Sequence, residues 1–206
     1  MKTYGMIPSV IDGTEDIFKE PKNIGLPKQF SYKKYLPEVV DQGLDPICVP
    51  CSLSAYINWT LNLKDGKEID NNIKLFDIFN SRTIEGDNGM TFKDALKFVQ
   101  KQGVKTDKGL IKIGRYAKVN SLLALKYALM LNGPCVGGLP VYDSRITEFW
   151  KNYSGELEGL HAVCIVGYTD DGFIIRNSWG KTYGEDGYAF IKNEDADLFT
   201  EIWTIV

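Results

Sequence analysis

Histidine is nearly absent from this 206-residue chain, which contains only His161. A zinc site built from three imidazoles, or from two histidines on one helix, is therefore excluded, and any imidazole chemistry must use His161. An excess of basic charge is also missing, because 24 Lys and Arg face 27 Asp and Glu. The sequence thus lacks the basic stripe of a nucleic-acid-binding protein, and we expect no nucleic-acid partner.

Long apolar runs are absent as well. No stretch reaches the length of a membrane helix, and residues 1–16 lack the apolar core of a secretory signal peptide. We therefore expect a cytoplasmic protein with no membrane partner. The four cysteines, Cys48, Cys51, Cys135 and Cys164, are few for this length, and in a reducing compartment we expect free thiols.

The sequence predicts an α+β protein whose first half is mainly helical and whose second half is mainly β. Residues 1–28 are rich in Pro, Gly, Lys and Asp and predict an extended N-terminal arm. Residues 29–206 would form one domain, with a helical lobe over about 40–115 and a β lobe over about 116–206. Helical spacing is found over residues 48–63, 68–80, 91–102 and 120–131, and strand patterns over residues 135–141, 161–168, 172–177, 187–192 and 201–206.

Four residues have the chemistry of a thiol-based catalyst. A cysteine at a helix N-terminus, such as Cys48, gains thiolate stability from the helix dipole and the unpaired N–H groups there. An imidazole such as His161 carries the proton, and an amide such as Asn177 orients the ring. Gln42, just before the nucleophile, can help to stabilise an oxyanion. The sequence alone does not place these residues together in space.

Five ordered blocks resemble the papain/cathepsin family of cysteine peptidases, over roughly residues 26–206. They are Gln42-Gly43 six residues before Cys48, Gly86-Asp87-Asn88-Gly89, His161-Ala162-Val163, Asn177-Ser178-Trp179-Gly180 and Gly184-Glu185-Asp186-Gly187-Tyr188. Any one block alone would be weak, whereas five in the family's order are specific. The resemblance implies a papain-like two-lobed fold, in which the helical lobe packs against an antiparallel β-barrel-like lobe and the active-site cleft lies between them.

The resemblance also implies a role for each matching residue. Cys48 would attack a peptide carbonyl to form a thioester acyl-enzyme, His161 would act as general base and then acid, and Asn177 would orient His161. Gln42 and the Cys48 N–H would form the oxyanion hole. The residues implied in substrate binding are Asn88, Gly89, Met90, Leu160, Ala162, Trp179 and Tyr183. Trp179 would also cover the hydrogen bond between Asn177 and His161. No metal and no organic cofactor are expected; the partners would be a peptide or protein substrate and a protein inhibitor.

Several positions depart from the family pattern. Val49 and Pro50 follow Cys48, where an aromatic residue is usual, and Asp87 stands where a disulfide cysteine is usual. Met90 replaces the second glycine of the substrate-binding loop. The arm is too short for the helical inhibitory propeptide. These features resemble the signal-less bacterial, archaeal or phage branch of the family.

Alternatives remain open from the residues themselves. Spacing from Gln42 favours Cys48 as nucleophile, but Cys51 lies one turn later on the same helix. Together they spell C-x-x-C, a redox or half-zinc motif that lacks a second pair here. The same fold could instead perform acyl transfer or hydrolyse a non-protein amide, or it could be a catalytically degenerate binding module. The oligomeric state is left open.

The arm supplies a separate hypothesis. Its extended, Pro-containing composition suggests that it wraps the body of the protein or lies near the cleft. If the arm occludes the site, truncation at about Lys28 raises activity.

Overall fold

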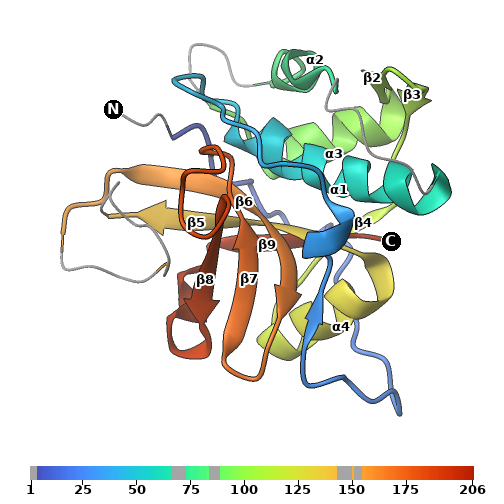
Figure 1. Ribbon diagram of the computed structural model, residues 1–206. Coiled ribbons are helices and arrows are strands. Elements are labelled where there is room, and N and C mark those ends of the chain that lie inside the picture. Colours follow the sequence, from blue (N-terminus) through green and yellow to red (C-terminus); the bar gives the residue numbers. More distant parts are fainter. Residues whose placement is uncertain (1–3, 66–72, 84–88, 143–149, 151–154) are drawn as a thin grey trace.

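The computed structural model describes residues 4–65, 73–83, 89–142, 150 and 155–206. Its centre is an antiparallel sheet in the order β4-β9-β5-β6-β7-β8, with the short strand β1 pairing with β6 (Figure 1). The bounds are β1 Phe30–Ser31, β4 Tyr116–Lys118, β5 Cys135–Val141, β6 Gly159–Tyr168, β7 Gly172–Arg176, β8 Tyr188–Lys192 and β9 Glu201–Ile205. β6 is the longest of these strands and pairs with β5, β7 and β1.

Helices lie on both sides of this sheet. The helices α1 (Cys48–Asp65), α2 (Leu75–Phe79) and α3 (Phe92–Lys101) gather on one side with the hairpin of β2 (Val104–Thr106) and β3 (Gly109–Ile111) (Figure 1). The helix α4 (Leu122–Asn132) covers the other side. Two 3-10 helices, η1 (Lys33–Tyr35) and η2 (Asn193–Leu198), complete the described elements. The predicted α+β architecture with an antiparallel sheet is confirmed.

Most predicted elements form at or near their predicted bounds. The strand over residues 135–141 is β5 itself, and the helix over residues 48–63 is α1. The side chains of Thr91 and Ser121 accept hydrogen bonds from the N–H groups of Asp94 and Ala124, which marks the starts of α3 and α4. Of the helical pattern over residues 68–80, the described part contains only α2, and residues 66–72 lie outside the described residues.

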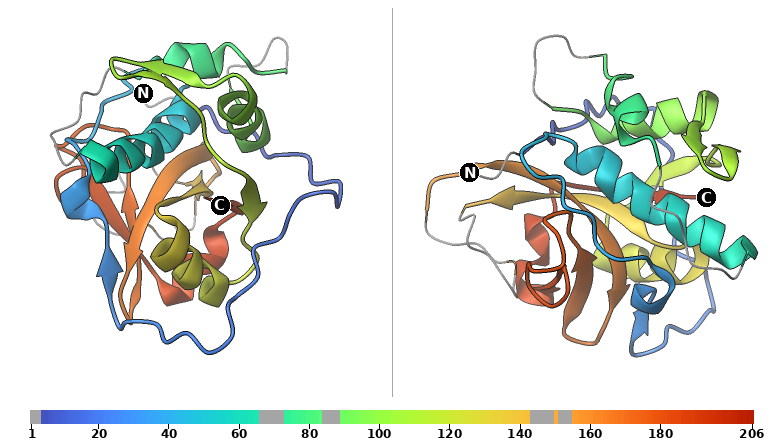
Figure 2. Two further views of the ribbon diagram at one scale, coloured as in Figure 1. Left: turned by 90° about the vertical axis from the view of Figure 1, so that its right-hand side faces the viewer. Right: turned by 45° about the horizontal axis from the view of Figure 1, so that its top comes forward.

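The N-terminal arm follows the surface of the domain over a long distance. Its Asp16 and Phe18 exchange backbone hydrogen bonds with Lys118 of β4. The carbonyl of Ile24 accepts a hydrogen bond from Tyr127 of α4. The arm then runs around the side of the molecule and returns as β1 beside β6 (Figure 2). Among the described residues, no helix combines the length and hydropathy needed to cross a bilayer.

The cap of α3 should contribute measurably to stability, because the side chain of Thr91 accepts a hydrogen bond from the N–H of Asp94 at the helix start. Replacing an N-cap threonine by alanine costs about 1 kcal/mol. We expect Thr91→Ala to lower the free energy of unfolding in urea by about that amount, and Thr91→Ser, which keeps the hydroxyl, to change it by a few tenths. Equal losses for both variants would contradict a capping role.

Candidate active site

Cys48 is the first residue of α1 and follows the loop that contains Gln42. Pro50 lies in the first turn, where its missing N–H leaves no hydrogen bond unmade, and the N–H of Cys51 bonds to the carbonyl of Ile47. Cys48 and Val49 are both fully buried. Val49, which stands where the family has an aromatic residue, is part of the core between the helices and the sheet. Packing in this core thus accommodates valine at the position where the family usually has an aromatic residue.

His161 lies on β6, and Asn177 follows the last residue of the neighbouring strand β7. His161 Nε2 and Asn177 Oδ1 are 2.7 Å apart, and both residues are buried. Asn177 Oδ1 also accepts the N–H of Ser178 at 2.7 Å. Because two groups converge on this amide oxygen, the side chain of Asn177 is fixed toward the imidazole.

Aromatic rings surround this hydrogen bond. The Trp179 ring lies 4.6 Å from the His161 ring, centroid to centroid, and Trp179 is 2% exposed. Tyr183 contacts Trp179 edge to face at 4.9 Å, so it buttresses the ring beside the histidine. On the same imidazole, Trp150 is stacked at 6.0 Å with an interplanar angle of 2°. Sequence reasoning missed Trp150, because no motif surrounds it.

Gln42 belongs to the same network. Its backbone N–H bonds to the carbonyl of Ser178 at 2.9 Å, and its side-chain oxygen accepts the Ser178 hydroxyl. Its side-chain amide donates to the carbonyl of Asp45 at 2.8 Å. Ser178 therefore links the segment of Gln42, which leads into Cys48, to the segment of Asn177. The structure brings all four residues of the predicted constellation into one region.

The four cysteines are free thiols, each of them buried. Burial raises the pKa of Cys48, while the backbone N–H groups of Ala162 and Gly5 lower it through hydrogen bonds to the sulfur. Burial also raises the pKa of Cys51, and that of Cys135 to about 12. Cys48 and Ala162, the residue that follows His161, belong to the same core. Cys51 is buried in the same core, and burial is the main cause of its raised pKa.

The arm passes through the predicted substrate-binding residues. The N–H of Met90 donates to the carbonyl of Gly5 at 2.8 Å, and the carbonyl of Met90 accepts the N–H of Ile7 at 3.0 Å. The N–H of Met6 donates to the carbonyl of Leu160 at 3.3 Å. Met6 and Met90 thus form a parallel bridge.

The arm also packs against the other predicted substrate-binding residues. A side-chain atom added at Gly89 would lie 2.8 Å from Ile7, and the Tyr4 ring lies 6.4 Å from the His161 ring. Ala162 contributes to the same core as Met6. Asn88 lies outside the described residues.

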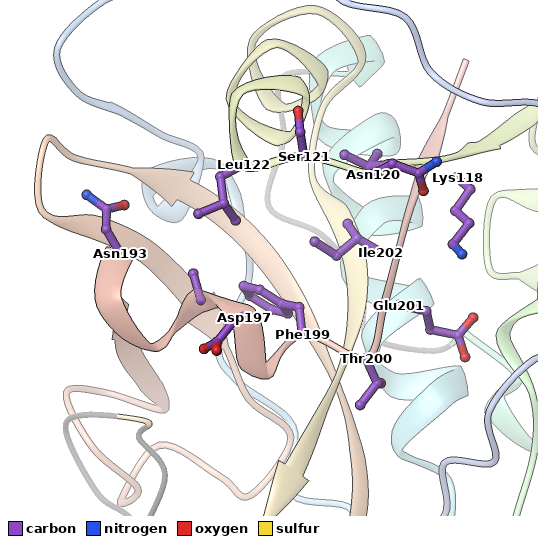
Figure 3. Close-up of a pocket in the computed structure, with 12 residues that line it drawn as sticks. Lys118, Asn120, Ser121, Leu122, Asn193, Asp197, Phe199, Thr200, Glu201 and Ile202 are labelled. Atoms are coloured by element: carbon purple, nitrogen blue, oxygen red, sulfur yellow. The ribbon is translucent and has the colours of Figure 1, made fainter.

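An apolar pocket lies away from these residues. It has a volume of about 400 Å³ and is found between the start of α4, η2 and β9 (Figure 3). Leu122, Phe199 and Ile202 supply apolar walls, and Lys118 and Asp197 lie at its edge. None of the predicted site residues lines it. Among the described residues, no group of three or more His, Cys, Asp or Glu side chains could bind a metal ion.

Comparison with known proteins agrees with this arrangement. The family model described as papain family cysteine protease matches residues 73–201. An uncharacterized peptidase C1-like protein of Acanthamoeba polyphaga mimivirus is 25% identical over 98% of this chain and 77% of its own length. Cathepsin B-like cysteine proteinase 1 of Haemonchus contortus is 34% identical over 35% of this chain, and this chain spans only 23% of that protein.

Among solved structures, xylellain, a cysteine protease from Xylella fastidiosa, superposes with a TM-score of 0.84 at 28% identity. The match covers 98% of this chain and 95% of xylellain. The family model begins after Cys48, so the segment with Val49 and Pro50 falls outside it. With more than half of the chain matched and the whole fold shared, this chain belongs to the papain family of cysteine proteases.

Proposed function

We propose that this cysteine peptidase hydrolyses peptide bonds with Cys48 as nucleophile, His161 as proton carrier and Asn177 as the residue that orients the ring. The buried 2.7 Å contact between His161 and Asn177, on the strand that adjoins the Cys48 sulfur, is the observation that carries the proposal. A nucleophile, a base and a group that orients the base form the arrangement typical of covalent catalysis.

The hydrogen bonds that Asn177 Oδ1 accepts determine which nitrogen of the His161 ring takes the proton from the thiol. Because Asn177 Oδ1 accepts hydrogen bonds, His161 Nε2 carries the proton in their contact. Nδ1 is then the atom that takes the proton from the Cys48 thiol. A neutral amide orients the imidazole without the strong rise in basicity that a carboxylate would cause.

The reaction then proceeds in two halves. The Cys48 thiolate attacks the peptide carbonyl, and the oxyanion is stabilised by the Cys48 N–H and the side-chain amide of Gln42. His161 donates its proton to the leaving amine, which departs and leaves a thioester. Water, deprotonated by His161, attacks the thioester and releases the acid product with regeneration of the thiol.

Two neighbouring cysteines allow a direct test of the nucleophile. We expect Cys48→Ala to abolish hydrolysis and labelling by a thiol-directed epoxysuccinyl inhibitor, as read by mass spectrometry of the intact protein. Cys51→Ala is the matched control and should retain both, because Cys51 is a buried core thiol. Labelling that moves to Cys51 in the Cys48→Ala protein would contradict the assignment.

Product analysis with an added amine separates hydrolysis from acyl transfer.

Because the chain has a single histidine, replacing it tests the assignment of the general base directly. We expect His161→Ala to lower kcat by at least about 100-fold, the range of a lost general base, because the chain has no second imidazole. Asn177→Ala should lower kcat less and leave KM nearly unchanged, since it disturbs only the ring orientation. Trp59→Phe, far along α1 from Cys48, serves as a folding control. Unaltered kcat in His161→Ala would exclude the proposed mechanism.

We further propose that the arm keeps this site occluded. Its backbone uses Met90 and Leu160, the residues implied in binding a substrate main chain. At the Cys48 sulfur the arm presents the N–H of Gly5. A thiol attacks a carbonyl carbon and cannot attack an amide N–H. The arm therefore fills the cleft without placing a peptide bond where Cys48 could cleave it. The arm, which the sequence predicts to wrap around the domain, would thus inhibit the peptidase of its own chain.

Gly5 permits a sharp test of occlusion. A methyl group at Gly5 would overlap the backbone carbonyl of Pro46, whereas Gly25 has no atom within 4 Å of an added Cβ. We expect Gly5→Ala to displace the arm and raise peptide hydrolysis several-fold, as truncation at Lys28 would, while Gly25→Ala behaves as the parent. Equal activity of the parent, Gly5→Ala and the truncated chain would contradict occlusion.

The same variant should shift the pH dependence of thiol reactivity. Burial raises the Cys48 pKa in the occluded form, so the thiolate appears only at higher pH. Displacing the arm removes the Gly5 N–H, whose hydrogen bond lowers the pKa, but it also admits water and so reduces the burial that raises the pKa. Burial is the larger effect, so the pKa should fall. We expect the midpoint of the pH profile for iodoacetamide alkylation of Cys48 to lie lower in Gly5→Ala than in the parent and in Gly25→Ala. A midpoint that rises or stays constant would contradict this account.

A further inference from the structure

Positive charge is concentrated in one stretch of a chain whose overall charge is slightly negative. The net charge of −3 predicts no basic stripe, yet residues 97–118 contain seven basic residues and one acidic residue, Asp107. This stretch runs from α3 through the hairpin of β2 and β3 into β4. Five of its lysines are exposed: Lys97, Lys101, Lys105, Lys108 and Lys112. The charge balance of the whole chain thus conceals a local basic surface.

Three lysines form a row along α3. Lys93, Lys97 and Lys101 are each four residues apart, and side chains at this spacing lie on one face of a helix. The buried residues of the helix lie on the opposite face: Phe92, Ala95, Leu96 and Val99. Lys97 and Lys101 are exposed and form no ion pair with any of the described residues. Like charges at this spacing destabilise a helix, so helix stability does not account for the lysine row.

The arm shows which chemical groups the lysine row binds. The ammonium group of Lys93 donates to the carboxylate of Glu15 at 2.6 Å and to the carbonyl of Val10 at 2.9 Å. The carboxylate of Asp12 lies 3.6 Å from the same ammonium group. The N–H of Asp12 also donates to Glu15, which holds the two carboxylates together. An acidic stretch of peptide therefore already binds the first lysine of the row.

The lysine row leads from the cleft to the hairpin. It begins beside Met90, which precedes the N-cap of α3, and it ends at Lys101, the last residue of the helix. There the ammonium group of Lys112 donates to the carbonyl of Lys101 at 2.7 Å, and the hairpin adds Lys105 of β2 on the same side of the sheet (Figure 1). The 10 residues of α3 extend about 15 Å, a length that about five extended residues span. A chain bound beside Met90 can therefore reach Lys101.

We propose that the lysine row of α3, continued by Lys105, is a docking surface for an acidic segment of a protein substrate whose neighbouring segment enters the cleft. This inference rests on the proposed function, because it names the class of substrate that the peptidase would receive. The pairing of Lys93 with Glu15 favours a peptide carboxylate over a nucleic acid or a lipid surface. The positive field of the row would also attract an acidic chain before it reaches the cleft.

The first experiment measures binding without cleavage, in full chains that carry Cys48→Ala. The probe is a fluorescein-labelled peptide of alternating Glu and Gly, and its anisotropy is followed at low ionic strength. We expect Lys97→Glu/Lys101→Glu to weaken binding by at least about tenfold, since the field that attracts the peptide is reversed. Lys97→Gln/Lys101→Gln, which only removes the charges, should have an intermediate effect. Unaltered binding in both double variants would overturn the proposal.

The matched control is Lys22→Glu/Lys28→Glu, which changes the net charge by the same amount at exposed residues of the arm. It should bind the probe as tightly as Cys48→Ala alone, and a peptide of alternating Gln and Gly should not bind. Equal weakening by the control and by Lys97→Glu/Lys101→Glu would overturn the proposal. Duplex DNA or phosphatidylserine vesicles that compete for the row as well as the Glu peptide would overturn the assignment to an acidic peptide.

The second experiment measures selectivity in the full chain carrying Gly5→Ala, whose arm is displaced. One peptide substrate is extended at either end by a linker of about five residues and then by a run of Glu or of Gln. At one end we expect Glu to raise kcat/KM about tenfold over Gln at low ionic strength, the lower range for electrostatic steering. The gain should be lost in Lys97→Glu/Lys101→Glu, and in about 1 M salt, where the Debye length is about 3 Å. No gain at either end would overturn the proposal.

Failure of the proposed function would look different. In that case no peptide is hydrolysed by the Gly5→Ala protein, while the Glu peptide still binds the lysine row of the Cys48→Ala protein. Hydrolysis that is retained without any binding of the Glu peptide would count against the docking surface alone.

Discussion

The packing of α1 against β6 is the contact on which the rest of the site depends. Cys48 is the first residue of α1, and it packs in one core with Ala162 of β6. His161 precedes Ala162 on the same strand. Pairing of β6 with β7 then positions Asn177 for its contact with His161. A small shift of the helix along the strand would move Cys48 relative to His161, although each would remain in a well-packed core.

Burial fixes the geometry of the hydrogen bond between His161 and Asn177. The hydrogen bond between His161 and Asn177 lies among Trp150, Trp179 and Tyr4, away from competing water. In such an environment a hydrogen bond is electrostatically stronger and an unsatisfied polar group is more costly. The indole of Trp150 is itself anchored on the carbonyl of Pro140 in β5. The aromatic walls therefore restrict the imidazole to one orientation.

The arm completes the surface that this site would otherwise expose. The backbone of the arm forms hydrogen bonds with Met90 and Leu160, and the side chain of Met6 packs against Gly138 of β5. The arm runs parallel to the Met90 segment at this point. One set of contacts thus covers both the main chain beside Met90 and the face of β5.

The sequence by itself determined the local structure and the chemistry available. The N-caps, the strand β5, the helix after Gln42 and the identity of the single imidazole all follow from neighbouring residues, because capping, periodicity and composition are local properties. It did not show that Trp150 would stack on His161, or that Met6 would meet Gly138.

Only the tertiary structure decided these last contacts, because they join residues that are far apart in the chain. Trp150 reaches the imidazole through anchors on β5 and β8, and Met6 reaches Gly138 across more than half of the chain. Such contacts depend on how strands and the arm are laid side by side, and no periodicity or motif encodes that arrangement. Packing in three dimensions, rather than local preference, therefore brought these distant residues into contact.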